Sequence, residues 1–181
     1  MRIVLVTGTV GVGKSTVGFA VAERAARAEA PTAFVDVDQL SRSWPAPDDD
    51  PFGENLARAN LAAVAPNYRA AGVALLVLAW VVEGEADITR LEGSLGMPVT
   101  VVRLTSPAAV VEARLRSRHR GPDAEGLAWH LRRAPELAAT QAALDAPTVD
   151  AEGPVAAVAD RVLQVIGEVP SSPAPTGDTP T

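Results

Sequence analysis

Short apolar runs alternate with longer segments of mixed polarity along almost the whole chain. Aliphatic and β-branched residues dominate the short runs, which predicts five strands at residues 2–7, 32–37, 73–82, 99–104 and 147–149. The longer segments predict six helices, at residues 14–29, 54–71, 85–95, 107–119, 125–143 and 154–168. Proline within two of these segments predicts a bend near Pro66 and an interruption near Pro135.

The order of these elements predicts the architecture. Because a helix follows each strand, we expect parallel βαβ units, which gives an α/β fold with a five-stranded parallel sheet and helices on both faces. Ligands of such sheets bind beyond the carboxyl ends of the strands. The length of 181 residues suits one domain at residues 1–168, and the many Pro, Ser and Thr residues at 169–181 predict a disordered C-terminal tail.

The most specific motif lies between the first strand and the first helix. Residues 8–15 read GTVGVGKS and match the phosphate-binding pattern G-x-x-x-x-G-K-[ST], which predicts a P-loop NTPase fold. We expect Lys14 to contact the β- and γ-phosphates of ATP, Ser15 to bind Mg²⁺ and Thr16 to contact the α-phosphate. The expected nucleotide-binding residues are Gly8, Thr9, Gly11, Val12, Gly13, Lys14, Ser15 and Thr16. Lys14 is also the only lysine among 16 basic residues.

Two aspartates close the second strand, in the segment FVDVDQL. In a parallel sheet this strand end lies on the same side as the phosphate loop. One carboxylate is suited to hold Mg²⁺ through water and the other to accept a proton from a substrate hydroxyl. We assign Asp38 as the general base and Asp36 to the metal. The alternative is that Asp38 caps a short helix at residues 39–43.

The phosphate loop followed by D-x-D resembles small-molecule kinases of the nucleoside-monophosphate-kinase-like group. Adenylylsulfate kinase, shikimate kinase, gluconate kinase and chloramphenicol phosphotransferase belong to that group. In adenylylsulfate kinases the segment is typically D-G-D-N-x-R, whereas here Val37 replaces the glycine and Arg42 stands one place later. The resemblance implies substrate-binding and general-base roles around Asp36 and Asp38.

A cluster of arginines follows the fourth strand, where residues 114–120 read RLRSRHR. In related kinases this segment begins a small helical lid whose arginines hold the transferred phosphoryl group. Arg118 and Arg120 resemble those catalytic residues, and Arg114 is a further nucleotide-binding candidate. Guanidinium groups suit this role because they bind phosphate through two hydrogen bonds. The alternative is a solvated basic helix end, and Arg132 and Arg133 on the next helix are within reach of the same space.

The acceptor is expected to bind the loop at residues 41–60, together with Asp38. Candidate substrate residues there are Arg42, Trp44 and Arg58, and the same stretch also offers Phe52, Asn55 and Asn60. Glu83 follows the third strand. The third strand contains no aspartate, which departs from nucleoside-monophosphate kinases. Glu83 is accordingly either a substrate-positioning group or an exposed helix start.

Composition narrows the class of partner. A net charge of −6 disfavours nucleic acid, and no apolar run is long enough to span a membrane. Without a second lysine the chain lacks a guanine-recognition motif, which favours ATP over GTP. The expectation is a cytoplasmic, ATP- and Mg²⁺-dependent phosphotransferase that moves the γ-phosphoryl group to a hydroxyl of a small molecule. The alternatives are a nucleoside or nucleoside-monophosphate kinase and an ATP-binding switch or accessory ATPase; the oligomeric state stays open.

Overall fold

The computed structural model describes residues 1–119, 124–167 and 169, with the side chains of residues 124 and 125 excepted. Within this part of the chain, five parallel strands form one sheet in the order β2-β3-β1-β4-β5. The strands are β1 (Arg2–Gly8), β2 (Thr32–Asp36), β3 (Leu75–Ala79), β4 (Val99–Thr105) and β5 (Thr148–Asp150). The predicted α/β class and parallel sheet are confirmed. The division at residue 168 stays a prediction, because most of the tail lies outside the described residues.

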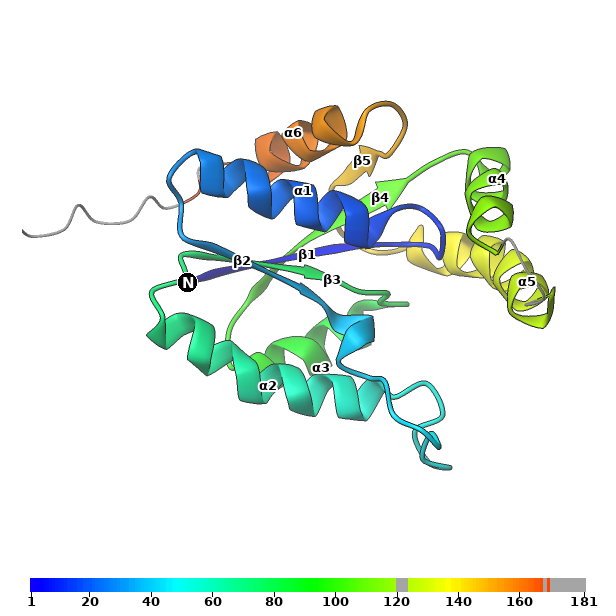
Figure 1. Ribbon diagram of the computed structural model, residues 1–181, viewed down its shortest axis with the longest axis horizontal. Helices are drawn as coiled ribbons and strands as arrows, with labels where there is room; N and C mark the ends of the chain where they lie inside the picture. Colours follow the sequence, from blue (N-terminus) through cyan, green and yellow to red (C-terminus); the bar gives the residue numbers. More distant parts are fainter. Residues whose placement is uncertain (120–123, 168, 170–181) are drawn as a thin grey trace, which may run out of the picture.

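Helices cover both faces of the sheet (Figure 1). They are α1 (Lys14–Arg27), α2 (Glu54–Ala70), α3 (Glu85–Leu95), α4 (Ala108–Arg118), α5 (Ala124–Gln141) and α6 (Val155–Ile166), with the 3₁₀ turn η1 (Val37–Gln39) after β2. Helices α1 and α6 lie on one face and α2 and α3 on the other, whereas α4 and α5 lie beyond the carboxyl ends of the strands (Figure 1). The parallel strands thus direct the loop after β1, the loop after β2 and α5 toward the same end of the molecule.

Two prolines lie inside continuous helices. Pro66 falls within α2 and Pro135 within α5, so the predicted interruption near Pro135 is wrong. Both prolines are exposed, and each leaves the backbone carbonyl four residues earlier without its helical donor.

The core is divided by the sheet according to the alternation of side chains along its strands. Val4 and Val6 of β1 pack with residues of α1 and α6, whereas Ile3 and Leu5 pack with residues of α2 and α3. All four side chains are at most 1% exposed, so β1 is covered by helices on both faces. This accounts for its continuous apolar sequence. The central position of β1 fixes the loop that follows it.

A smaller cluster attaches α4 and α5 to that loop. Val111 and Leu115 of α4 are buried against Ala134 of α5, and Val10 of the loop packs on the same cluster. Helices α4 and α5, between which the predicted lid segment lies, are therefore attached to the phosphate loop.

Candidate active site

The loop between β1 and α1 depends on glycine at two close positions. Gly13 ends the loop with φ 111°, and Gly11 has φ 83°, both in the region that side chains other than glycine rarely adopt. A Cβ atom at Gly11 would lie 2.8 Å from Cγ of Leu115, so the loop also approaches α4 too closely for a larger residue. The motif glycines therefore shape a backbone turn that wraps the start of α1.

The N-terminus of α1 is built to receive an anion. Among the described residues, no side chain caps this helix, and its first turn contains no acidic residue. Ser15 and Thr16 of that turn are exposed. The first backbone N–H groups of a helix lack intrahelical partners and carry the positive end of its dipole. Uncapped N–H groups beside two accessible hydroxyls match the requirements of a phosphate site.

Lys14 lies buried inside the same loop. Its Nζ atom donates a hydrogen bond to the carbonyl oxygen of Thr9 at 3.1 Å, and the side chain is 8% exposed. The Oγ1 of Thr9 donates in turn to the carbonyl oxygen of Ala134 at 2.6 Å, which fastens the loop to α5. Burial, together with the charge of Arg118, lowers the pKa of Lys14 to about 8, against the opposing effect of the carboxylates of Asp38 and Asp36.

The two aspartates of the D-x-D segment have different environments. Asp36 Oδ1 accepts a hydrogen bond from the backbone N–H of Asp38 at 3.2 Å, so Asp36 rather than Asp38 caps the short turn η1. Asp38 reaches the mouth of the site and is accessible to solvent. The protein around its carboxyl group nevertheless disfavours the charged form and raises its pKa, against the opposing charge of Lys14. The helix-cap alternative for Asp38 is wrong, and its carboxylate is available for chemistry.

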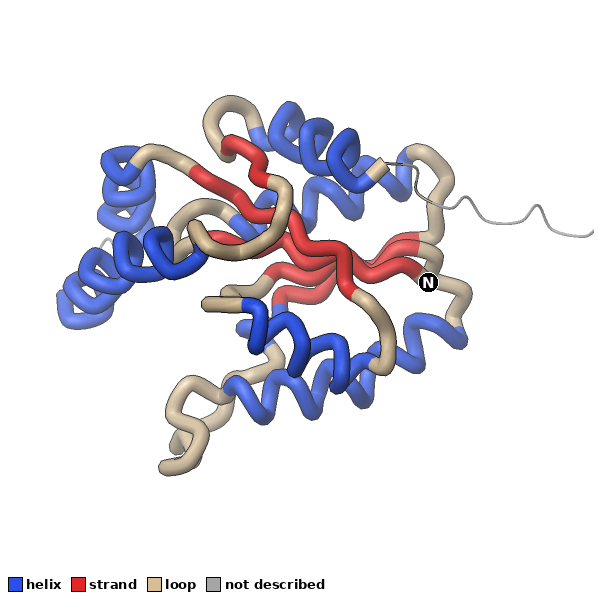
Figure 2. The backbone as a smooth tube through the Cα atoms, turned by 180° about the vertical axis from the view of Figure 1, so that it is seen from behind, coloured by secondary structure: helices blue, strands red, loops and turns tan. Residues whose placement is uncertain are grey.

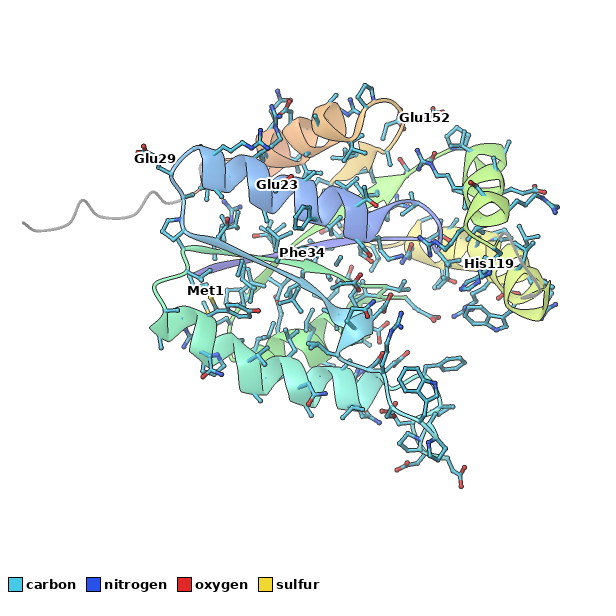
Figure 3. All side chains as sticks on the ribbon, in the orientation of Figure 1. Met1, Glu23, Glu29, Phe34, His119 and Glu152 are labelled. Atoms are coloured by element: carbon cyan, nitrogen blue, oxygen red, sulfur yellow. The ribbon has the colours of Figure 1, made fainter. Side chains whose placement is uncertain are left out.

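The arginines of the α4 segment separate into two kinds. Arg114 donates from Nη1 to the carbonyl oxygen of Val12 at 2.8 Å and from Nη2 to that of Ala151 at 2.9 Å. It therefore joins the phosphate loop to the loop after β5. Arg118 is exposed at the end of α4, and its charge acts on the pKa of both Lys14 and Asp38. Arg120 lies outside the described residues, whereas His119 faces α5 (Figure 3).

A cavity of about 240 Å³ adjoins Asp38 and the phosphate loop. Its wall is formed by the start of α2, the end of β3 with the loop that follows, and one side of α5. Figure 2 shows the loop before α2 and helix α5 on opposite sides of the strand ends. The lining residues are Val10, Asp38, Phe52, Glu54, Arg58, Trp80, Val81, Val82, Glu83, Asp87, Trp129, His130, Arg133 and Leu137. A cavity that places a carboxylate next to a phosphate site suits a phosphoryl acceptor.

An ion pair closes one side of this cavity. Arg133 of α5 binds the carboxylate of Glu83, and its Nη1 lies 3.2 Å from Oε2 of Glu136. The hydrogen bond that Arg133 donates to Glu83 raises the pKa of Arg133. Asp87 accepts hydrogen bonds from the backbone N–H groups of Glu83 and Gly84 at 2.7 and 3.3 Å, which fixes the start of α3. Glu83 is therefore a cavity residue with a cationic partner, not an exposed helix start.

The predicted acceptor residues are only partly brought together. Arg58 and Glu83 line the cavity, and Arg42 lies near enough to Asp38 to lower its pKa. Trp44 is 82% exposed and does not line the cavity, so its predicted place in the acceptor site is not supported. Residues 41–53 form no described helix or strand, so no regular element directs the Trp44 ring toward the cavity.

Sequence reasoning missed two aromatic lining residues, Trp80 and Trp129, whereas Phe52 belongs to the segment predicted to bind the acceptor. Trp80 directly follows β3, and Trp129 lies on α5. Aromatic residues are scarce in this chain, at 4%, so their positions near strand ends were informative. Asp87 carried the ordinary signal of a helix-capping carboxylate in the first turn.

The described residues contain no cluster of three or more His, Asp or Glu side chains arranged to hold a metal ion. A magnesium ion at this site would depend on Ser15, a water-bridged carboxylate and phosphate oxygens, which is the donor set that Mg²⁺ accepts. None of the described helices has the length and apolarity needed to cross a lipid bilayer.

Comparison with solved structures gives similar folds. A gluconokinase from Sinorhizobium meliloti 1021 is 22% identical with a TM-score of 0.61, covering 91% of each chain. A tunicamycin resistance protein from Deinococcus radiodurans is 21% identical with a TM-score of 0.58, covering 95% of this chain and 99% of that one. A shikimate kinase from Bacteroides thetaiotaomicron is 18% identical with a TM-score of 0.57, covering 91% and 98%.

The chain therefore has the fold of P-loop small-molecule kinases. The resemblance to gluconate and shikimate kinases drawn from the sequence is confirmed at the level of the fold. No protein-family model and no curated protein sequence matches the chain.

Proposed function

We propose that this protein transfers the γ-phosphoryl group of ATP to a hydroxyl group of a small molecule. The observation that carries the proposal is the position of the Asp38 carboxylate, which faces both the cavity and the buried ammonium group of Lys14. A protein that only bound or hydrolysed ATP would not need an acceptor cavity with a carboxylate beside the phosphate loop.

In this proposal the phosphate loop and the start of α1 bind the triphosphate, and Lys14 neutralises its β- and γ-phosphates. Mg²⁺, bound by Ser15 with Asp36 acting through water, would neutralise charge on the same phosphates. Asp38 accepts the proton of the acceptor hydroxyl while the oxygen of that hydroxyl forms a bond to the γ-phosphorus. The bond from that phosphorus to the bridging oxygen breaks, and ADP leaves.

Arg118 would stabilise the charge of the transferred group, with Arg120 as a second candidate. Arg114 supports nucleotide binding indirectly, because it holds the backbone of two loops through Val12 and Ala151. Glu83 and Arg58 belong to the acceptor side through the cavity that they line.

Incubation with γ-labelled ATP, Mg²⁺ and a panel of acceptors tests the proposal. The panel contains neutral alcohols, sugar acids, nucleosides and nucleoside monophosphates. Label in the phosphate ester of an alcohol supports the proposed reaction. Label in a nucleoside diphosphate would indicate a nucleoside-monophosphate kinase, and free phosphate alone would indicate an ATPase. Lys14→Ala serves as the control for contaminating kinase activity.

A further inference from the structure

Aromatic side chains are concentrated at the candidate acceptor cavity. Phe52, Trp80 and Trp129 line it, although the chain has only three Trp, three Phe and one Tyr. The rings of Phe52 and Trp129 lie 6.3 Å apart with an interplanar angle of 32°, and these residues are 68% and 41% exposed. Large exposed rings that meet at a cavity, from segments far apart in the sequence, are typical of a surface that receives an apolar ligand face.

The arginines of the cavity are already engaged by groups of the protein. Arg133 binds Glu83 and Glu136. Arg58 donates to Oδ1 of Asn55 at 2.6 Å and lies 3.9 Å from Glu54. A carboxylate or phosphate on an acceptor would have to compete with these partners, because each guanidinium charge is neutralised by a carboxylate nearby.

The lining as a whole favours ligands without negative charge. Four carboxylate residues line the cavity, Asp38, Glu54, Glu83 and Asp87, against two arginines, and one of the four, Asp87, is paired with Arg90 outside the lining. His130 of α5 is a further polar residue of the lining. Arg42 and Arg118 are near enough to favour the charged form of Asp38, but they are not among the lining residues.

We propose that the acceptor is a non-anionic alcohol with a flat apolar ring, which lies against Phe52 and Trp129 and presents its hydroxyl to Asp38. The Glu83–Arg133 pair acts in specificity, because it withholds the guanidinium group from anionic acceptors. This inference rests on the proposed kinase function and adds the chemical class of the acceptor.

Matched ligands test the class by calorimetric titration of the full chain, with and without MgADP. Phenyl β-D-glucopyranoside and phenyl β-D-glucuronide differ by one carboxylate, and methyl β-D-glucopyranoside lacks the aromatic ring. Uridine and uridine 5′-monophosphate form a second charge-matched pair. We expect the neutral ring compound of each pair to bind about tenfold more tightly than its anionic counterpart, and phenyl glucoside to exceed methyl glucoside similarly. Tighter binding of the anionic members, or no binding by either neutral ring compound, would overturn the inference.

Variants test the residues. Phe52→Ala and Trp129→Ala should each weaken binding of the neutral ring compounds about tenfold without changing that of methyl glucoside. Phe19→Ala is the matched control, because Phe19 is 53% exposed but packs edge-to-face on Phe34 beside α1, away from the cavity. Equal losses in all three variants would contradict the assignment. Glu83→Gln should improve binding of phenyl glucuronide relative to phenyl glucoside, because it frees the guanidinium group of Arg133. An unchanged ratio of the two affinities would contradict the role of the ion pair in specificity.

Transfer assays with the same ligands separate this inference from the proposed function. Efficient phosphorylation of the anionic members would overturn the acceptor class and leave the kinase function standing. Binding of the neutral ring compounds without any phosphoryl transfer would support the proposed class of ligand and contradict the proposed kinase function.

Discussion

Lys14 Nζ donates a hydrogen bond of 3.1 Å to the carbonyl oxygen of Thr9, so the single lysine of the chain lies within the phosphate loop itself. Burying an ammonium group costs stability unless it is paired, and here burial lowers its pKa to about 8. A bound triphosphate would add negative charge to that of the Asp38 and Asp36 carboxylates nearby. The loop therefore holds a cation whose environment is most favourable when an anion is bound.

Lys14→Ala should abolish tight ATP binding while leaving the fold intact, because the variant removes a desolvated charge and no core side chain. Lys14→Arg should fail to restore turnover, since the larger planar group does not replace a compact ammonium in this loop. Calorimetric ATP titration and thermal unfolding measure the two effects separately. Turnover by Lys14→Ala at the level of the unaltered protein would contradict the assignment.

ATP binding should take up a proton in alkaline solution. The pKa of Lys14 lies at about 8, below its ordinary value of 10.5, so the free protein loses this proton as the pH rises above about 8. Bound phosphates favour the ammonium form, so binding at about pH 9 requires uptake of nearly one proton, and binding at about pH 7 requires almost none. Titrations in buffers of different ionisation enthalpy measure the uptake. Identical heats in all buffers at the higher pH would contradict this account.

Arg118→Ala should lower kcat about 100-fold with little change in MgATP affinity, if its guanidinium group acts on the transferred phosphoryl group. Arg116→Ala is the control, since Arg116 lies two residues away and pairs with Glu112 at 2.7 Å. Steady-state kinetics on both variants test the role. Similar small effects in the two would assign Arg118 to the solvated helix end.

Arg114→Ala should weaken ATP binding and lower the free energy of unfolding by about 1–3 kcal/mol, because two buried carbonyl oxygens lose their donor. Arg114→Lys should be intermediate, since one ammonium group does not reproduce both bonds, to Val12 and to Ala151. Denaturant unfolding and ATP titration give the two values. A loss of stability with unchanged ATP affinity would leave Arg114 a purely structural role.

The sequence predicted the features that depend on local pattern or on parallel topology. The alternation of apolar runs with helical segments gave the five strands, and the motif at Gly8–Ser15 gave the turn before α1. The proximity of Asp38 to Lys14 followed as well, because parallel strands bring their carboxyl ends to one edge.

Features that depend on side-chain direction were not predictable. The approach of Trp129 to Phe52 requires α5 to fold back across the cavity, and no local pattern specifies that crossing. Two acidic residues accept hydrogen bonds from backbone: Asp36, which the sequence assigned to the metal, also caps η1, and Asp50 accepts from the N–H groups of Asn55 and Leu56 at 3.0 Å. Short polar side chains near helix starts satisfy free N–H groups, and the sequence alone does not separate that role from catalysis.

The most direct test of the central claim is the rate of phosphoryl transfer by Asp38→Asn, measured together with its MgATP affinity. Asparagine keeps the size of the side chain and removes the proton acceptor. We predict a loss of transfer of about 10²–10⁴-fold with MgATP affinity changed by less than about threefold. Transfer at the rate of the protein without the substitution would contradict the assignment of Asp38 as the base. It would also contradict the assignment of this cavity as the acceptor site.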